Sequence, residues 1–255
     1  MNLSNLVKSL LNLQKEIKVN FLPSQGLFYN NDFKVFIKRA NVEDVIDYEY
    51  KYVKDDLVVI INKIKKIVRR NVTLSPGYTF DDIKSIDIIF LFLEIVKFTK
   101  NEPIYFVYVN ELSEEFEIEF SSDNFNYFKP NGDLMRKYDK DEKCFLIDGY
   151  KYTLPSIGVE NSLTSFLYKK SNEPNAHLYN DYFYEFTHFV MNKRYLTHDE
   201  IDNLLHIFNF DIEESEFRKV QNIIDTFSPI QRYSLIKSGK VLEMDSKIDL
   251  EKIWK

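Results

Sequence analysis

The sequence predicts an α+β fold, and three sets of residue patterns support that class. Amphipathic helical patterns fill residues 41–100, alternating strand patterns flank this region at about 18–40 and 103–155, and helical patterns return in the C-terminal part. With 255 residues the chain fits one large domain or two small ones. We therefore expect an α+β domain over 1–158, in which helices pack a small antiparallel sheet, and an all-helical domain over 159–255.

The N-terminal part alternates between helix and strand signals. Apolar residues at near-helical spacing predict a short amphipathic helix over 3–19, whereas apolar residues at every second position predict a strand over 33–38. Asn41 is a suitable N-cap for a helix over 41–53. Residues 55–71 place apolar side chains on one helical face and basic side chains on the other, which predicts a surface helix.

A further helix is expected over 79–100. Thr79 and Asp82 resemble a capping pair at its start, and apolar side chains then surround the helix on nearly all sides. A helix of this kind is typically buried, so we expect it in the core.

The region 103–155 changes to strand patterns. The stretches IYFVYV and FEIEF are separated by an acidic turn, and KCFLIDGYKYTLP predicts a hairpin with Asp148-Gly149 at its tip. After residue 160 helical spacing returns. The expected helices cover 160–170, 179–194, 198–209 and 212–227.

The pattern L-P-S-x-G occurs twice, although the chain has only 6 glycines and 7 prolines. Proline fixes its own φ and glycine accepts a positive φ, so the pattern predicts a tight turn. Each copy follows an extended segment. The residues concerned are Leu22, Pro23, Ser24 and Gly26 in the first copy, and Leu154, Pro155, Ser156 and Gly158 in the second.

Patterns for cofactor and metal chemistry are missing from the sequence. The four histidines form no HxxxH or HExxH pair, and Cys144 is the single cysteine, so we expect neither a metal site nor an internal disulfide. The chain also lacks a P-loop and a G-x-G-x-x-G motif, so we expect no cofactor. A buried and inert Cys144 and a Cys-His nucleophile both remain open.

Carboxylates on the expected strand 115–120 allow a catalytic alternative. Glu117 and Glu119 point to one face of the strand, as an acid/base pair or a cation site requires. The simpler interpretation is the solvated face of a half-buried sheet. A small cytosolic hydrolase that uses these carboxylates or Cys144 is therefore kept as an alternative function.

The basic face over 63–70 allows a second alternative, a nucleic-acid-binding module. Lysines and arginines on one helical face can contact phosphate. The net charge of −6 argues against a dedicated nucleic-acid binder, and a solvated helix face explains the pattern equally well. The residues of this basic face are Lys63, Lys66, Arg69 and Arg70.

The expected location of the protein follows from missing signals. The longest apolar run, 88–93, is far shorter than the roughly 20 residues of a membrane span. The N-terminal stretch 1–20 lacks the continuous apolar region of a signal peptide. The sequence therefore predicts a soluble cytosolic product without a membrane partner.

The first turn and its surroundings carry a family resemblance. The stretch FLPSQGLFYNNDFKVFIKRANVEDVIDYE resembles the opening signature of baseplate hub subunits and hub-assembly proteins of T4-like contractile-tailed bacteriophages. That signature is an L-P-S-x-G-x-x-Y turn, which Tyr29 completes here, then a basic strand and an acidic helix. The resemblance covers roughly the N-terminal half of the chain. Many members have a C-x-x-C-like pair in the next hairpin, and this chain has none there, so no metal knuckle is expected.

The resemblance implies a role in phage tail assembly without catalysis, and therefore without a small-molecule substrate. The partners would be other baseplate hub or tail proteins. The protein would be either a hub subunit, present in the virion, or a chaperone that acts in the host cytoplasm and leaves before the particle matures. The abundance of aromatic residues, 22 Phe and 17 Tyr, agrees with a protein that binds other proteins. The two turns would then present rigid loops to partners, or they serve only to shape the fold.

Overall fold

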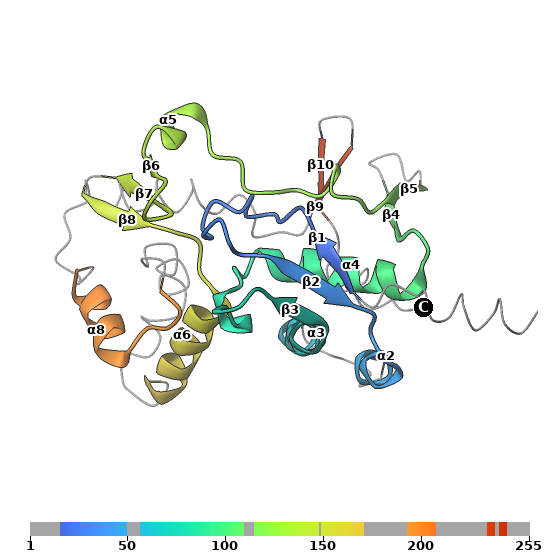
Figure 1. The fold of residues 1–255 in the computed structure, drawn as a ribbon, viewed down its shortest axis with the longest axis horizontal. Coiled ribbons are helices and arrows are strands. Elements are labelled where there is room, and N and C mark those ends of the chain that lie inside the picture. The colour runs from blue at the N-terminus through green and yellow to red at the C-terminus, as the bar shows by residue number, and fades with distance from the viewer. Residues whose placement is uncertain are drawn as a thin grey trace, which may run out of the picture.

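The computed structural model describes residues 16–49, 57–109, 115–147, 149–170, 193–207, 234–237 and 240–243. Helices and small antiparallel sheets alternate along the chain, which confirms the mixed α+β class. Figure 1 shows the first sheet at the centre with helices behind and below it, and a second group of short strands and helices to one side.

The first sheet has the order β1-β2-β3 and is antiparallel throughout. It is formed by β1 (Glu16–Val19), β2 (Val35–Lys38) and β3 (Val72–Leu74). The helix predicted over 3–19 is wrong for its last four residues, and its first part lies outside the described residues. Ile17 pairs with Ile37 and Val19 pairs with Val35, so a two-residue apolar period places both side chains on the core side.

Three helices cover this sheet and form the main core. They are α2 (Val42–Glu49), α3 (Leu57–Asn71) and α4 (Asp87–Lys100). Most side chains of α4 are buried, as predicted. Figure 1 shows α4 passing behind β1 and β2, with α3 and α2 along its lower side. The sheet and these helices enclose the largest apolar cluster of the described chain.

The start of α4 differs from the prediction. Thr79 and Asp82 do form a capping box, but they cap the short 3₁₀ helix η1 (Phe80–Asp82), and α4 begins only at Asp87. Lys84, between these helices, pairs with Ser156 as an isolated β-bridge. The intervening segment therefore bonds to a distant part of the chain, which replaces the helical hydrogen bonds that the sequence suggested.

Two further groups of strands follow α4. The hairpin of β4 (Tyr105–Val109) and β5 (Glu115–Glu119) agrees with the predicted strand pair. A second sheet contains β6 (Tyr138–Asp139), β7 (Cys144–Ile147) and β8 (Tyr150–Tyr152), preceded by the short helix α5 (Gly132–Met135). Gly149 has a φ of 84°, as the predicted Asp-Gly hairpin tip requires.

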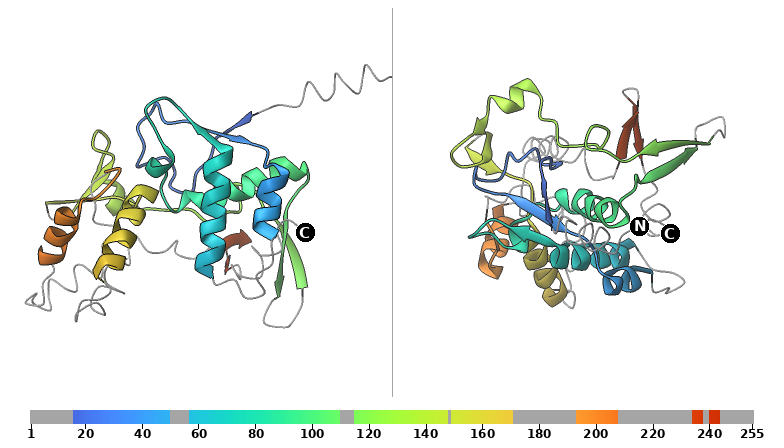
Figure 2. Two further views of the ribbon diagram at one scale, coloured as in Figure 1. Left: turned by 90° about the horizontal axis from the view of Figure 1, so that it is seen from below. Right: turned by 45° about the vertical axis from the view of Figure 1, so that its right-hand side comes forward.

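The C-terminal part is described in pieces. The helices α6 (Ile157–Lys170) and α8 (His198–Ile207) agree with two predicted helices and pack against each other (Figure 2). Their apolar cluster comes wholly from residues 159–201, while the division into domains at residue 158 remains a prediction. The predicted helices over 179–194 and 212–227 lie outside the described residues, apart from residues 193–194, which form no helix.

The prediction of an all-helical C-terminal part is wrong in one place. The strands β9 (Ser234–Lys237) and β10 (Lys240–Glu243) form an antiparallel hairpin. The sequence between them is Ser-Gly, and two-residue connections that contain glycine favour hairpins. Leu235 and Leu242 pair across the hairpin, so alternation rather than helical spacing governs this segment.

Candidate functional site

The two L-P-S-x-G turns converge on one short segment, residues 83–87, which runs from the end of η1 to the first residue of α4. The second turn pairs with this segment through the main chain. Ser85 N donates to Pro155 O at 3.0 Å, and Ile157 N donates to Ile83 O at 2.9 Å. We call the segment 83–87, together with the turn residues that bond to it, the joint.

The first turn reaches the same segment through side chains. The amide and the hydroxyl of Ser24 each donate a 2.8 Å hydrogen bond to the carboxylate of Asp87. Tyr29 donates a 2.6 Å hydrogen bond to the same carboxylate and accepts one from Lys84 N at 2.7 Å. Ser24 and Asp87 are fully buried, so these bonds fix the turn on the start of α4 without competition from water.

Lys84 places a second ionisable group in this joint. Its side chain is only 2% exposed, its Nζ lies 3.4 Å from Thr153 Oγ1, and the same Nζ lies 5.7 Å from the centre of the Phe28 ring. Burial lowers the pKa of Lys84 to about 7 and raises the pKa of Asp87 to about 6. Burial, with the adjacent Asp87 charge, also raises the pKa of Tyr29 well above its usual value.

The local geometry of the first turn follows from its sequence. Gln25 N donates to Leu22 O at 2.7 Å, which closes a turn with Pro23 at its second position. Gln25 and Gly26 both have positive φ, 56° and 70°. Phe128 N then donates to Pro23 O at 2.8 Å, and Gln25 Nε2 donates to Phe128 O. The turn is thus held on both sides, by α4 and by the chain around residue 128.

The glycines of the two turns have different roles. Gly26 lies in the left-handed region of φ, and a Cβ there would meet no atom within 4 Å. Gly158 has no such φ, but a Cβ there would lie 2.1 Å from Arg194 O. Gly26 therefore serves the turn itself, whereas Gly158 permits the close approach of the segment that begins at residue 193.

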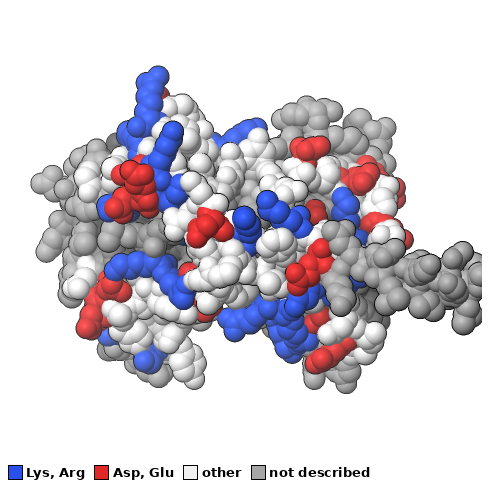
Figure 3. Space-filling view, in the orientation of Figure 1, with Lys and Arg blue, Asp and Glu red and all other residues white. Residues whose placement is uncertain are grey.

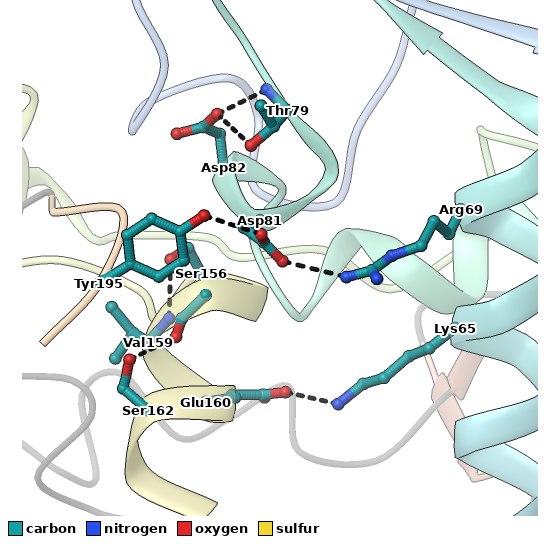
Figure 4. Close-up of polar contacts among 11 residues, drawn as sticks. Lys65, Arg69, Thr79, Asp81, Asp82, Ser156, Val159, Glu160, Ser162 and Tyr195 are labelled. Carbon is teal, nitrogen blue, oxygen red and sulfur yellow. Dashed lines mark hydrogen bonds and ion pairs between the residues drawn. The ribbon is translucent and has the colours of Figure 1, made fainter. Parts of the chain in front are cut away.

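A polar cluster around η1 connects α3 with α6 and with the segment that precedes α8 (Figure 4). Asp81 accepts hydrogen bonds from Arg69 at 3.2 Å and from the Tyr195 hydroxyl at 3.0 Å. Arg194 Nε donates to Asp82 at 2.8 Å. Lys65 of α3 forms a 2.7 Å ion pair with Glu160 of α6. The contacts of this cluster join α3, η1, α6 and the segment 193–196.

The predicted basic face of α3 takes part in such contacts within the chain. Arg69 pairs with Asp81, and Arg70 pairs with the fully buried Asp44 at 2.8 Å. Lys63 and Lys66 also interact within the chain. The cations proposed for phosphate contact thus have intramolecular partners, although nucleic-acid binding itself remains a prediction.

A cleft of about 690 Å³ lies beside the exposed side of the first turn. It is lined by the chain leaving β1, by Gln25 and Gly26, by the chain entering β2 and by Ser122, Asp123 and Tyr127. Phe21, Phe33 and Tyr127 provide aromatic surface. The volume lies within the range of about 300–1,000 Å³ typical of ligand pockets. Of the two predicted turns, only the first contributes residues to this cleft.

Most predicted contact residues of the turns are buried. Pro23, Ser24, Tyr29, Leu154, Ser156 and Gly158 are buried, while Leu22 and Pro155 are partly exposed. Their atoms therefore position the turns, and Gln25 and Gly26 form the exposed part of the first turn. The sequence patterns did not identify Lys84 and Asp87, and the available signal was a charged residue within a helix that was expected to be buried.

The groups of the catalytic alternative belong to different sheets. Glu117 and Glu119 are exposed on the β4–β5 hairpin, whereas Cys144 is buried in the β6–β7–β8 sheet. Burial raises the pKa of the Cys144 thiol, which disfavours the nucleophilic thiolate. Among the described residues, no cluster of three His, Cys, Asp or Glu side chains is arranged to hold a metal ion.

Comparisons with protein families, with curated proteins and with solved structures find no match for this chain. In the ranges that the structure describes, no helix is long and apolar enough to cross a membrane.

Proposed function

We propose that the chain is a non-catalytic assembly protein of a contractile-tail baseplate hub and that it acts by binding other hub or tail proteins. The observation that carries this proposal is the position of the cleft. It lies against the turn whose sequence resembles the signature of the hub family, and it contains exposed groups of that turn, Gln25 and Gly26.

The rigidity of the cleft wall supports a binding role. Ser24 and Tyr29 attach the turn to Asp87, and Phe128 bonds to Pro23 on the other side. A binding surface that is already ordered loses little conformational entropy when a partner docks. The buried network thus explains how a loop of the chain can present a fixed shape.

The chemistry of the cleft suits a protein partner. Asn20 and Ser122 line it and have no hydrogen-bond partner for their side chains in the described parts of the chain. Phe21, Phe33 and Tyr127 line the same cleft. Aromatic side chains are enriched at protein interfaces, which also contain polar groups that form hydrogen bonds to the partner.

Mass spectrometry of purified phage particles, together with pull-downs from infected cells, tests this proposal. A hub subunit is found in the particle, and a chaperone is absent from the particle but retains hub proteins in the pull-down. If the protein is in neither sample, the proposal is wrong. Salt-dependent retention on DNA would then favour the nucleic-acid alternative, and turnover of hydrolase substrates would favour the catalytic one.

A substitution that fills the cleft tests the site. Asn20→Trp places a bulky side chain at an exposed cleft position, and we expect it to abolish the capture of hub proteins. Asn203→Trp makes the same change on an exposed position of α8, far along the chain from the cleft, and should leave capture unchanged. Equal capture by both variants would remove the cleft from the proposal.

A further inference from the structure

Two lysines beside the cleft have no charge partner among the residues that the structure describes. Lys18 lies on β1 and Lys34 immediately precedes β2, and both line the cleft. Lys18 pairs with Phe36 in the sheet, so Lys34, two residues before Phe36, lies on the same face and is its diagonal neighbour. Neither ammonium group has a hydrogen-bond or ion-pair partner within the described residues. Asp123 is the one acidic residue among the described residues that line the cleft.

The β4–β5 hairpin has a complementary surface. Glu117 pairs across the hairpin with Val107, and Glu119 pairs with Tyr105. Tyr105 and Val107 are 51% and 52% exposed, and neither carboxylate has an ion-pair partner in the described chain. We call these four residues the acidic hairpin face. The opposite face of the hairpin is buried in the main core, so the acidic hairpin face is held in a fixed orientation.

Some other charged side chains nearby do form ion pairs within the chain. Nearby, Lys38 lies 3.8 Å from Glu16, and Lys100 lies 3.9 Å from Glu102. Figure 3 shows blue and red side chains intermixed across one face of the molecule, with red ones among those towards the side where β4 and β5 lie.

We propose that a second copy of this chain docks its acidic hairpin face onto the cleft beside Lys18 and Lys34. The spacing of the charges supports this pairing. Glu117 and Glu119 are two positions apart on a strand, about 7 Å, and diagonal neighbours across a ladder such as Lys18 and Lys34 are about 7–8 Å apart. Each carboxylate can thus meet one ammonium group.

The apolar part of each surface fits the same arrangement. Docking would remove Tyr105 and Val107 from water against the aromatic lining of the cleft, and burial of apolar area stabilises association. Aromatic side chains are enriched at such interfaces. The acidic hairpin face and the cleft are different surfaces. Each copy can therefore dock its hairpin on one neighbour and bind the hairpin of another neighbour in its cleft. The docked copy also fills the cleft, so self-association competes with the binding of a hub partner.

Sedimentation velocity of the purified full chain tests the inference without any hub protein. We expect an average mass above that of one chain at low salt, falling towards the mass of the monomer as salt increases. The double variants Lys18→Glu/Lys34→Glu and Glu117→Lys/Glu119→Lys should each weaken association by about tenfold or more. A mixture of the two variants should associate again, because their changed charges are complementary.

A control double variant distinguishes the loss of this contact from the effect of a changed net charge. Lys137→Glu/Lys140→Glu changes the charge equally at two exposed lysines without ion-pair partners in the described chain, and it should associate like the wild type. Circular dichroism confirms that each variant is folded. A wild-type chain that sediments as a monomer at all concentrations overturns the inference. Association that is unchanged in both double variants, or that does not return in their mixture, overturns it as well.

Discussion

Tyr29 and Asp87 are 58 residues apart in the chain, and the hydroxyl of Tyr29 donates a 2.6 Å hydrogen bond to the Asp87 carboxylate. The same hydroxyl accepts a hydrogen bond from Lys84 N. Tyr29 therefore satisfies two polar groups that are both buried. This relationship joins the first L-P-S-x-G turn to the segment that the second turn also binds.

Tyr29→Phe should destabilise the protein by about 2–3 kcal/mol, because it leaves a buried acceptor and a buried donor without a partner. The phenyl ring can keep its stacking on Phe33, whose centre lies 3.9 Å away. Chemical denaturation measures the free energy of unfolding. Tyr78→Phe is the matched control, since the Tyr78 hydroxyl donates to Asp32 at an exposed site, and it should cost less than about 1 kcal/mol. Equal losses in the two variants would show that the buried network adds nothing.

The buried pair predicts an unusual dependence of stability on pH. Asp87 has its pKa raised to about 6 in the folded state, so the folded protein binds a proton that the unfolded chain releases near pH 4. Its contribution to the free energy of unfolding is therefore present at low pH and is lost as pH rises towards 6. Each unit of difference between the folded and unfolded pKa corresponds to about 1.4 kcal/mol. The free energy of unfolding should therefore fall by a few kcal/mol across this pH range.

Lys84 acts in the opposite direction at higher pH. Its pKa is lowered to about 7 in the folded state, so between about pH 7 and 10 the unfolded chain binds the extra proton. The contribution of Lys84 therefore rises with pH across this range. The joint is least stable near pH 6–7, where both groups are charged.

Unfolding curves of the wild type and two variants between pH 4 and 10 check this prediction. Asp87→Asn should remove the fall in stability between pH 4 and 6, and Lys84→Met should remove the rise above pH 7. The readout is the slope of stability against pH relative to the wild type, so a general loss of stability in a variant does not affect it. Parallel curves for all three proteins would contradict the predicted shifts.

Local patterns were enough to predict most elements of the N-terminal part. The apolar period of α3, the alternation in β4 and β5 and the Asp-Gly tip of the β7–β8 hairpin each depend on neighbours within a few residues. The same local rules favoured a helix over 3–19, because Ile17 fits a helical face. Pairing with β2 gives Ile17 and Val19 a better burial as a strand.

The joint between the two turns could not be predicted from local patterns. Ser24 is 63 residues from Asp87, and Lys84 is 69 residues from Thr153. A single sequence gives no sign of which distant segments meet. An aspartate in a helix that is expected to be buried could have indicated a buried charge, which requires partners, but the sequence does not identify those partners.

The two L-P-S-x-G glycines should respond differently to alanine. Gly158→Ala places a Cβ 2.1 Å from Arg194 O, so the segment 193–197 must move away from α6. We expect faster hydrogen exchange and proteolysis in this segment. Gly26→Ala meets no atom and should cost about 1–2 kcal/mol of global stability through its positive φ. Protection of 193–197 that is unchanged in Gly158→Ala would show that the close approach is not needed.

The ion pair between Arg70 and Asp44 should contribute much more to the free energy of unfolding than an exposed ion pair does. Asp44 is fully buried and lies 2.8 Å from Arg70 Nη1, with further hydrogen bonds from Asn71 and the Asn41 amide. Arg70→Met removes the only cation that forms an ion pair with this carboxylate in the described chain. We expect a loss of about 3 kcal/mol, because the remaining charge is buried without compensation.

Arg136→Met provides the matched comparison. Arg136 and Asp133 also form an ion pair, at 3.2 Å, but both side chains are exposed. Exposed pairs of this kind contribute about 0–1 kcal/mol, so this variant should unfold like the wild type. Denaturation at low and high salt distinguishes the two cases, since salt screens the exposed pair and affects the buried one little. A small loss in the free energy of unfolding of Arg70→Met would mean that the amide donors alone stabilise Asp44. Arg70, on the basic side of α3, would then contribute less to the stability of the fold than its contacts indicate.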